Sequence, residues 1–283
     1  MGMNPVPAVL ATDLDGTLAV DGSIGVENRR AAAALREAGI PILVITGRNR
    51  WSVDRVRGLW DVADAVLFSS GAGLLEGPGD AGRELCRLPE AQVRAIRSVL
   101  DAAGEDYVIL DPAPENHHGV ARRHRPATEN PDFERRWMRY RRWIRADDGS
   151  DRAASQFIVI RPPGAPGRDG LESVLSSWST FGGSSPLDGA SLWLEVFPAG
   201  RDKGRALADW CRSRGIADDR VMVLGNDLND VPMLRRAAHP RVVADSPRVL
   251  RERFPVVAPA DRDGFAAAAR EALRLFGRGD SVA

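Results

Sequence analysis

The feature that most constrains this chain is a short apolar run that ends in two carboxylates. Residues 8–12 have the length and character of a buried strand, Asp13 and Asp15 follow directly, and Gly16 begins a turn. Because side chains at positions i and i+2 of an extended chain point the same way, the two carboxylates would lie close enough to share a cation. Such a pair repels itself unless a cation neutralises it. The pattern predicts a divalent ion, a nucleophile and a proton carrier; the alternative is an ordinary acidic turn.

Length and composition describe a soluble globular protein with room for one large domain or two moderate ones. The 283 residues are 43% hydrophobic and 28% charged, with a formal net charge of zero. We therefore expect no general attraction to nucleic acid or to a membrane. Cys86 and Cys211 are too few for a disulfide framework, and the start of the chain lacks the pattern of an export signal. A cytoplasmic protein is the expectation, and its oligomeric state is left open.

The basic residues are almost all arginine. Lys203 is the only lysine among 39 basic residues. In a chain so rich in arginine, a surviving lysine indicates a place where a compact ammonium is required and a planar guanidinium does not fit. Its position in the fold tests this interpretation.

Strands and helices alternate at the start of the chain. The expected elements are a helix over residues 26–38, a strand over 41–45, a helix over 51–59 and a strand over 65–69. This order predicts an α/β fold with a doubly wound, Rossmann-like parallel sheet. Ligands of such sheets bind beyond the carboxyl ends of the strands, where Asp13, Asp15 and Thr46 would lie.

The rhythm changes after about residue 83 and returns near residue 201. The changed segment has expected helices over 89–103, 132–145 and 169–178 and expected strands over 107–110, 155–160 and 191–197. Its short, widely spaced strands indicate an inserted α+β domain. The returning part has expected helices over 202–214 and 231–236, strands over 221–224 and 241–244, and helices near 247 and 264. The expected division is a core of residues 1–83 and 198–283 with an inserted domain of residues 84–197.

The polar residues at the ends of these elements are of the types that phosphoryl transfer requires. The set consists of Asp13, Asp15, Thr46 and Lys203 together with an acidic turn over residues 226–230. Positioning and charge neutralisation supply most of the catalysis in phosphoryl transfer. The lone lysine thus belongs to the same predicted set as the paired aspartates.

In these motifs the sequence resembles the haloacid dehalogenase superfamily of phosphohydrolases. Residues 13–18 match its first motif, 46–48 its second, 203–204 its third and 225–234 its fourth. The long insertion between the second and third motifs looks like the large α/β cap of the Cof-like branch. That branch includes sugar-phosphate, sucrose-phosphate and mannosyl-3-phosphoglycerate phosphatases. The resemblance therefore implies a Rossmann-like core with an inserted cap domain.

The resemblance also implies roles for individual residues. Asp13 would attack phosphorus and form an aspartyl phosphate, and Asp15 would act as general acid and then general base. Thr46 would hold the phosphoryl oxygen with the amide of Gly47, and Lys203 would pair with the nucleophile and the phosphate. The residues assigned to substrate binding are Gly47 and Arg48.

A Mg²⁺ ion is the implied cofactor. Its ligands would be Asp13, the backbone carbonyl of Asp15, and the fourth motif through Asn226, Asp227 or Asp230. Hard oxygen ligands fit Mg²⁺ better than zinc. The family's fourth motif usually begins Gly-Asp, so Asn226 is a departure that predicts weaker metal binding. A second departure is Ser70, where relatives often have asparagine.

Two further features have open interpretations. Residues 122–145 hold nine arginines against three acidic residues, and Trp137, Tyr140 and Trp143 are interleaved with the arginines. They form either an anion-binding or nucleic-acid surface, or an amphipathic helix whose aromatic side chains pack inward. His117, His118 and His124 resemble a metal cluster only in residue type, and loop histidines are the preferred interpretation because no matching cysteine or spaced acidic partner is evident.

The sequence thus predicts a Mg²⁺-dependent phosphatase that hydrolyses a small phosphomonoester, such as a sugar phosphate or a phosphoglycerate-type compound. One alternative is a phosphomutase or phosphotransferase, in which an acceptor alcohol replaces water. The other is a non-catalytic binding protein that uses the arginine-rich segment. Small phosphorylated molecules are the expected partners, and nucleic acid is not favoured.

Overall fold

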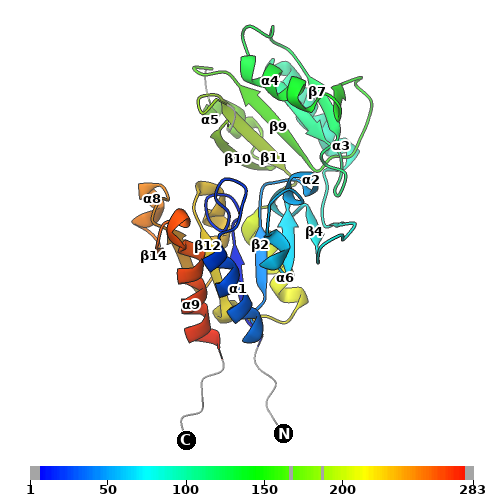
Figure 1. The fold of residues 1–283 in the computed structure, drawn as a ribbon. Helices are drawn as coiled ribbons and strands as arrows, with labels where there is room; N and C mark the ends of the chain where they lie inside the picture. Colours follow the sequence, from blue (N-terminus) through cyan, green and yellow to red (C-terminus); the bar gives the residue numbers. More distant parts are fainter. Residues whose placement is uncertain (1–6, 166–167, 186–187, 278–283) are drawn as a thin grey trace, which may run out of the picture. The chain divides into compact units, whose positions relative to one another are not determined.

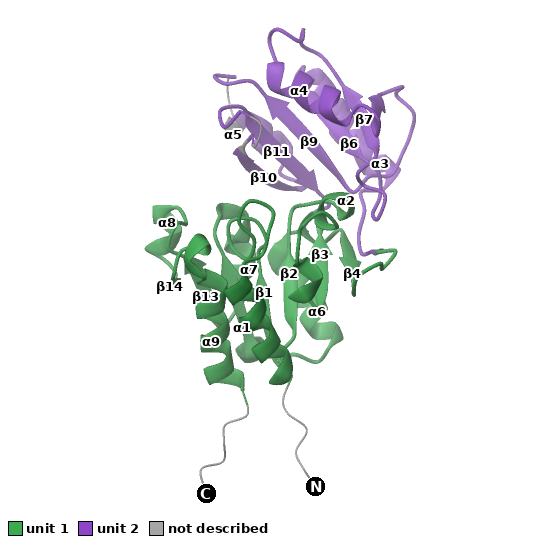
Figure 2. Ribbon diagram, in the orientation of Figure 1, with its two compact units in different colours: residues 1–82, 202–283 green, residues 83–201 purple. Residues whose placement is uncertain are grey.

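The computed structural model describes residues 7–165, 168–185 and 188–277. The chain divides into two compact units, one of residues 1–82 and 202–283 and the other of residues 83–201 (Figure 2). The first few residues, on which the expectation of no export signal depends, lie outside the described part. No helix of the described part is both long enough and apolar enough to span a membrane.

The first unit is built on a mainly parallel sheet (Figure 1). The strand order is β14-β13-β12-β1-β2-β3-β4-β5. All pairs from β14 to β3 are parallel, and β4 is antiparallel to β3. The strands are β1 (Val9–Thr12), β2 (Ile42–Ile45), β3 (Ala65–Phe68), β4 (Gly73–Leu75), β5 (Arg83–Glu84), β12 (Val221–Gly225), β13 (His239–Val243) and β14 (Val256–Val257).

Helices cover both faces of this sheet, which explains why its central strands are apolar throughout instead of alternating. In β1, Val9 and Ala11 belong to the apolar cluster that also contains side chains of α6 and α7, whereas Leu10 is buried but is not part of that cluster. Helices α1 and α9 pack against each other, as do α6 and α7. The helices are α1 (Val26–Glu37), α2 (Arg50–Val53), α6 (Lys203–Ser213), α7 (Val231–Arg236), α8 (Arg248–Arg251) and α9 (Gly264–Phe276).

The second unit has a six-stranded sheet in the order β10-β11-β9-β6-β7-β8. All of its pairs are antiparallel except β7 with β8. The strands are β6 (Asp106–Leu110), β7 (Gly119–Arg122), β8 (Ile144–Ala146), β9 (Gln156–Arg161), β10 (Ser179–Ser184) and β11 (Leu192–Phe197). The helices are α3 (Glu90–Ala102), α4 (Pro131–Tyr140) and α5 (Arg168–Val174).

Both faces of this second sheet are covered as well. Tyr107 and Ile109 of β6 pack in a cluster with side chains of α3 and α5, and Val108 and Leu110 pack in another with Phe133 of α4. Alternate side chains of strand β6 thus pack into two separate apolar cores, one on each face of the sheet. The predicted fold class, a doubly wound Rossmann-like core with an inserted α+β domain, is confirmed.

Several elements differ from those predicted. The helix expected over residues 132–145 ends at Tyr140, because Ile144–Ala146 pairs with β7 as strand β8. The helix expected over residues 51–59 is only the single turn of α2, followed by turns and a short 3₁₀ segment. Strands β4, β7, β8 and β10 were not expected. They are short or glycine-bearing, and pairing with neighbouring strands decides their conformation more than local preference does.

Candidate active site

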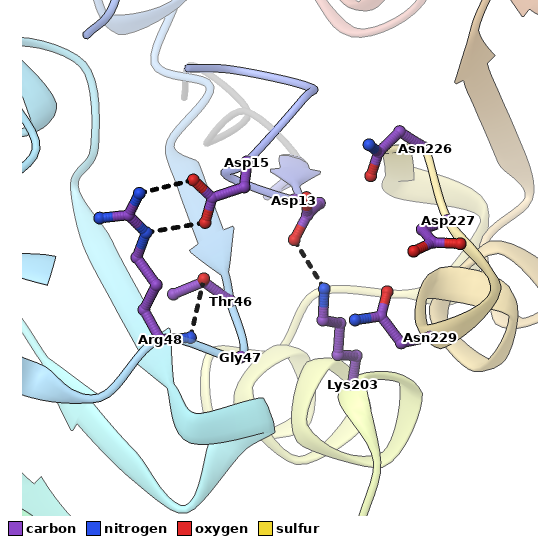
Figure 3. A pocket seen from close by; sticks show the side chains of 9 residues that line it. All are labelled: Asp13, Asp15, Thr46, Gly47, Arg48, Lys203, Asn226, Asp227 and Asn229. Atoms are coloured by element: carbon purple, nitrogen blue, oxygen red, sulfur yellow. Dashed lines mark hydrogen bonds and ion pairs between the residues drawn. The ribbon is translucent and has the colours of Figure 1, made fainter. Parts of the chain in front are cut away.

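The central strands of the first unit bring the predicted residues together. Strand β1 lies between β12 and β2, so the chain leaves the sheet from three neighbouring parallel strands at the same edge. The backbone N–H of Asp13 still donates to Leu224 O at 2.9 Å, which holds Asp13 in line with the sheet. A cavity of about 230 Å³ opens there (Figure 3), and its lining residues are Asp13, Asp15, Thr46, Gly47, Arg48, Lys203, Asn226, Asp227 and Asn229.

Lys203 enters this cavity from the first turn of α6. Asp202 caps the helix by accepting a hydrogen bond from the N–H of Arg205 at 2.7 Å. A Cβ atom on Gly204 would lie 2.4 Å from the carbonyl oxygen of Pro232, so only glycine allows the close approach of α6 to α7. This packing directs the lysine toward β1, where its side chain is 2% exposed.

The Lys203 ammonium binds two buried carboxylates. Its Nζ lies 2.6 Å from Asp13 Oδ1 and 2.7 Å from Asp230 Oδ1. Burial raises the pKa of Asp13 to about 7, although Lys203 opposes this, and the charge of Asp230 adds to the rise. Burial alone would lower the pKa of Lys203, but the two carboxylates outweigh it and hold that pKa above its usual range. The lysine therefore carries its charge at neutral pH.

Asp230 lies beside Lys203 and accepts hydrogen bonds from the loop after β12. Its side chain is fully buried, with Oδ1 on Lys203 and Oδ2 accepting from the N–H groups of Asn226 and Asp227 at 2.8 and 3.1 Å. It is also not among the residues that line the cavity. In this arrangement Asp230 orients the lysine and fixes the loop after β12, and its role as a metal ligand stays a prediction. A Cβ on Gly225 would lie 2.8 Å from Asp230, so this loop also requires glycine.

Asp15 and Arg48 form an ion pair at the mouth of the cavity (Figure 3). Both Asp15 oxygens accept hydrogen bonds from the Arg48 guanidinium, from Nε and from the second terminal nitrogen, each at 2.7 Å. The backbone N–H of Arg48 also donates a hydrogen bond to Thr46 Oγ1 at 3.1 Å. The predicted substrate-binding arginine therefore holds the predicted acid–base carboxylate, a contact that no sequence spacing reveals.

The fourth motif contributes amide and carboxylate oxygens. A Cβ on Gly16 would lie 2.5 Å from Asn226 Nδ2, so the turn after β1 leaves room for this amide beside the paired aspartates. Asp227 is exposed, and its Oδ1 accepts from the N–H of Leu228 at 2.7 Å. Asn229 lines the cavity but was not singled out from the sequence. Its place in the fourth motif was the signal available.

The loop after β3 supports the second motif. The N–H of Ser70 donates to Thr46 O at 2.8 Å, and the N–H of Ser69 donates to Arg48 O at 2.7 Å. Ser70 has φ +52°, a left-handed conformation that asparagine adopts more readily than most residues. This backbone conformation would therefore also suit asparagine, the residue that the resemblance led us to expect at this position.

A haloacid dehalogenase-like hydrolase family model matches residues 10–111 and 185–268. The chain belongs to this family. The match spans all four predicted motifs, so the resemblance drawn from the sequence is confirmed. No curated protein matches the chain.

Solved structures of other haloacid dehalogenase-like proteins share the fold over nearly the whole chain. One is a haloacid dehalogenase-like hydrolase from Bacteroides thetaiotaomicron, with 18% identity, coverage of 94% of this chain and 99% of that one, and a TM-score of 0.69. Another is the phosphatase BT1666 from the same organism, with 18% identity, coverage of 94% and 95%, and a TM-score of 0.73. A third is the subclass IIB sugar phosphatase BT4131, with 19% identity, coverage of 93% and 98%, and a TM-score of 0.71.

The arginine-rich segment, residues 122–145, lies in the second unit of this haloacid dehalogenase-like protein. Phe133, Trp137 and Tyr140 of α4 pack against an apolar cluster of the sheet, as an amphipathic helix requires. Arg136 lies over the rings of Tyr140 and Trp193, with its guanidinium carbon 5.3 and 4.5 Å from the ring centres. Much of this positive charge is thus stacked on aromatic side chains.

Proposed function

We propose that this chain is a Mg²⁺-dependent phosphatase that hydrolyses a small phosphomonoester through an aspartyl-phosphate intermediate. The observation that carries the proposal is the buried set of Asp13, Lys203 and Asp230, of which Asp13 and Lys203 line a polar cavity. Burying two carboxylates and an ammonium is costly, and such a set is retained where it has a chemical task. Membership of the haloacid dehalogenase-like hydrolases supports the same reaction class.

In the first step, the Asp13 carboxylate would attack phosphorus and the bond to the leaving alcohol would break. Lys203 holds Asp13 in one orientation and would offset the charge on the phosphoryl oxygens. The Thr46 hydroxyl and the Gly47 N–H lie at the same edge of the sheet and would hold the phosphoryl group. Asp15 would give its proton to the leaving oxygen, so no free alkoxide forms.

In the second step, water would attack the aspartyl phosphate. Asp15, now a carboxylate, would take a proton from this water while the bond between phosphorus and Asp13 breaks and inorganic phosphate leaves. Arg48 fixes the Asp15 carboxylate through two hydrogen bonds and would keep it directed at the cavity in the second step, whereas in the first step one Asp15 oxygen would carry the proton for the leaving group instead of accepting from Arg48. Arg48 is thus proposed as a positioning residue.

The donor set at the cavity fits Mg²⁺. Asp13, the backbone carbonyl of Asp15 and the Asn226 amide oxygen are hard oxygen donors, and Asp227 adds a nearby carboxylate. A bound Mg²⁺ would supply charge neutralisation for the phosphoryl oxygens. Because Asn226 stands where a carboxylate is usual, these residues would hold the ion with one negative charge fewer.

The substrate class proposed is a small polar phosphate such as a sugar phosphate or phosphoglycerate derivative. Solved relatives of the same fold include a sugar phosphatase. The cavity is lined by charged and amide side chains, with little apolar surface to hold a lipid or aromatic leaving group.

The test is phosphate release from a panel of sugar phosphates and phosphoglycerate derivatives, with and without Mg²⁺. Asp13→Asn should abolish turnover, and Asp15→Asn supplied with an aryl phosphate, whose leaving group departs without a proton, should accumulate chain that is heavier by one phosphoryl group in intact-mass measurements. An added acceptor sugar that diverts the phosphoryl group from water would favour the phosphotransferase alternative. Equal inactivity of wild type and Asp13→Asn on every compound, including aryl phosphates, would contradict the proposal.

A further inference from the structure

The loop between β6 and β7 in the second unit brings an acidic residue and two histidines together. These are Glu115, His117 and His118, and one ligand atom from each lies within 4.8 Å of the others. No acidic partner for the histidines was evident from the sequence, but the folded loop supplies one. His124 is elsewhere: its Nε2 lies 2.9 Å from Asp101 Oδ1.

The backbone holds this loop closed. The last pair of the hairpin is Leu110 with Gly119, and the N–H of Asp111 donates to His118 O at 3.0 Å across the loop. The N–H of His118 donates to Glu115 O at 2.9 Å. A Cβ on Gly119 would lie 2.2 Å from a carbonyl oxygen of β6, so only glycine permits this tight exit. Two prolines among residues 112–114 restrict the unfolded loop further.

Within the closed loop, the donor atoms converge on one carboxylate oxygen. Glu115 Oε2 lies 3.9 Å from His117 Nε2 and 3.6 Å from His118 Nδ1. Donor atoms around a tetrahedral zinc ion are ~3.4 Å apart, given metal–ligand bonds of ~2.0–2.1 Å. The two distances to the carboxylate therefore need to close by about 0.2–0.5 Å, and the distance between the histidine nitrogens, which is within 4.8 Å, by up to about 1.4 Å; Glu115 and His118 are exposed enough to move.

Neighbouring charges do not compete for this position. Asp111, at the base of the loop, is paired with Arg152 at 3.1 Å, which leaves Glu115 as the carboxylate beside the two imidazoles. The His117 ring also packs edge-on against Trp143, with ring centres 6.1 Å apart, and this contact restricts its rotation. A restricted histidine next to two adaptable ligands is a partly preorganised site.

We propose that Glu115, His117 and His118 form a second metal site, which binds a divalent transition-metal ion of the zinc type. Two imidazole nitrogens and one carboxylate oxygen suit Zn²⁺ and do not suit Mg²⁺, which prefers oxygen ligands. Three protein ligands leave a fourth position open to water or to an anionic ligand. This inference concerns the second unit alone and does not depend on the proposed phosphatase function.

The experiment is a titration of the full-length, metal-free protein with Zn²⁺ in the presence of excess Mg²⁺. Wild type should bind one Zn²⁺ per chain and unfold at a higher temperature with zinc present. His118→Ala and Glu115→Gln should each weaken zinc binding by at least about tenfold and lose the thermal shift, with unchanged circular dichroism. Both changes are at exposed side chains, so the variants should remain folded.

Two controls separate this site from other donors in the chain. His124→Ala removes a histidine of the same unit that is bonded to Asp101, and Asp13→Asn alters the proposed Mg²⁺ site; both should bind zinc like wild type. Co²⁺ bound in place of zinc should show no thiolate charge-transfer band, because neither cysteine is a ligand. Absence of zinc binding, unchanged binding by His118→Ala, or equal loss in either control would overturn the proposal.

Discussion

Lys203→Met tests the physical role of the only lysine. In the folded protein its ammonium lies 2.6 and 2.7 Å from two carboxylates, those of Asp13 and Asp230, and all three side chains are at most 8% exposed. Removing one partner of a buried ion pair costs about 3–5 kcal/mol, because a charge stays buried without compensation. We expect Lys203→Met to lower the free energy of unfolding by that amount near neutral pH and to abolish phosphatase activity.

The stability that Lys203→Met loses should increase as pH rises. Burial already raises the pKa of Asp13 to about 7, and loss of the lysine charge would raise it further. A raised carboxyl pKa favours the folded state at low pH, and this contribution is lost as pH rises through the folded-state value. Between about pH 7 and pH 9 the variant would hold one proton more than wild type. The difference in free energy of unfolding between wild type and the variant should therefore grow by up to about 2.7 kcal/mol over that range.

The assay is urea unfolding of metal-free protein at these two pH values, followed by circular dichroism. Arg205→Met is the matched control, because Arg205 lies on the same helix and pairs with Asp209 at the surface. Its effect should stay below about 1 kcal/mol and be independent of pH. If Lys203→Met unfolded at the wild-type urea concentration, or if its deficit did not grow with pH, the buried-triad argument would be refuted.

Three further predictions concern the metal ligands, the acid–base residue and the cysteines. Asn226→Asp should tighten Mg²⁺ binding by about tenfold in calorimetric titration, since it restores a carboxylate to the donor set. Arg48→Met should lower kcat by about tenfold while changing stability by less than about 1 kcal/mol, because it frees the half-exposed Asp15 carboxylate. Burial raises the pKa of the Cys211 thiol to about 11, so thiol reagents should modify Cys86 at least about 100-fold faster.

Each of these has a control. Asn226→Ala should weaken Mg²⁺ binding, and unchanged affinity in both Asn226 variants would exclude this residue as a ligand. Arg48→Lys keeps the positive charge but cannot form the bidentate pair with Asp15. Activity near wild type in this variant would show that a positive charge alone is sufficient to position Asp15. Cys86→Ser should remove the fast phase of thiol modification; a fast phase that survives would show that Cys211 is accessible.

The fold class and the cavity residues of the core were predictable because they depend on local signals. A continuous apolar strand followed by polar residues is typical of the carboxyl end of a parallel strand, and parallel strands deliver those ends to one edge of the sheet. Asp13, Asp15, Thr46 and Lys203 therefore line one cavity as the motifs indicated. The helix over residues 231–236 was placed correctly for a similar reason, since a polar, acidic turn leads into it and a proline lies in its first turn.

The partners of these residues were not predictable, because they depend on segments far apart in sequence. Asp230 faces Lys203 only after α6 packs on α7, and Arg48 meets Asp15 only where β2 lies beside β1. In the second unit, edge strands such as β10 have weak local preference and are fixed by pairing. Glu115 likewise reaches the histidines because the hairpin closes.

The sequence by itself determined which chemical groups this protein has at the ends of its strands. Periodicity and turn residues are local properties, and they fix the elements and the edge at which Asp13 and Thr46 emerge. Only the tertiary structure decided how those groups are used. Burial raises the pKa of Asp13, and Asp230 points to Lys203 instead of the cavity. Burial, distance and competing hydrogen bonds arise only when distant segments pack together, so they decide which carboxylate lines the cavity and which supports the lysine.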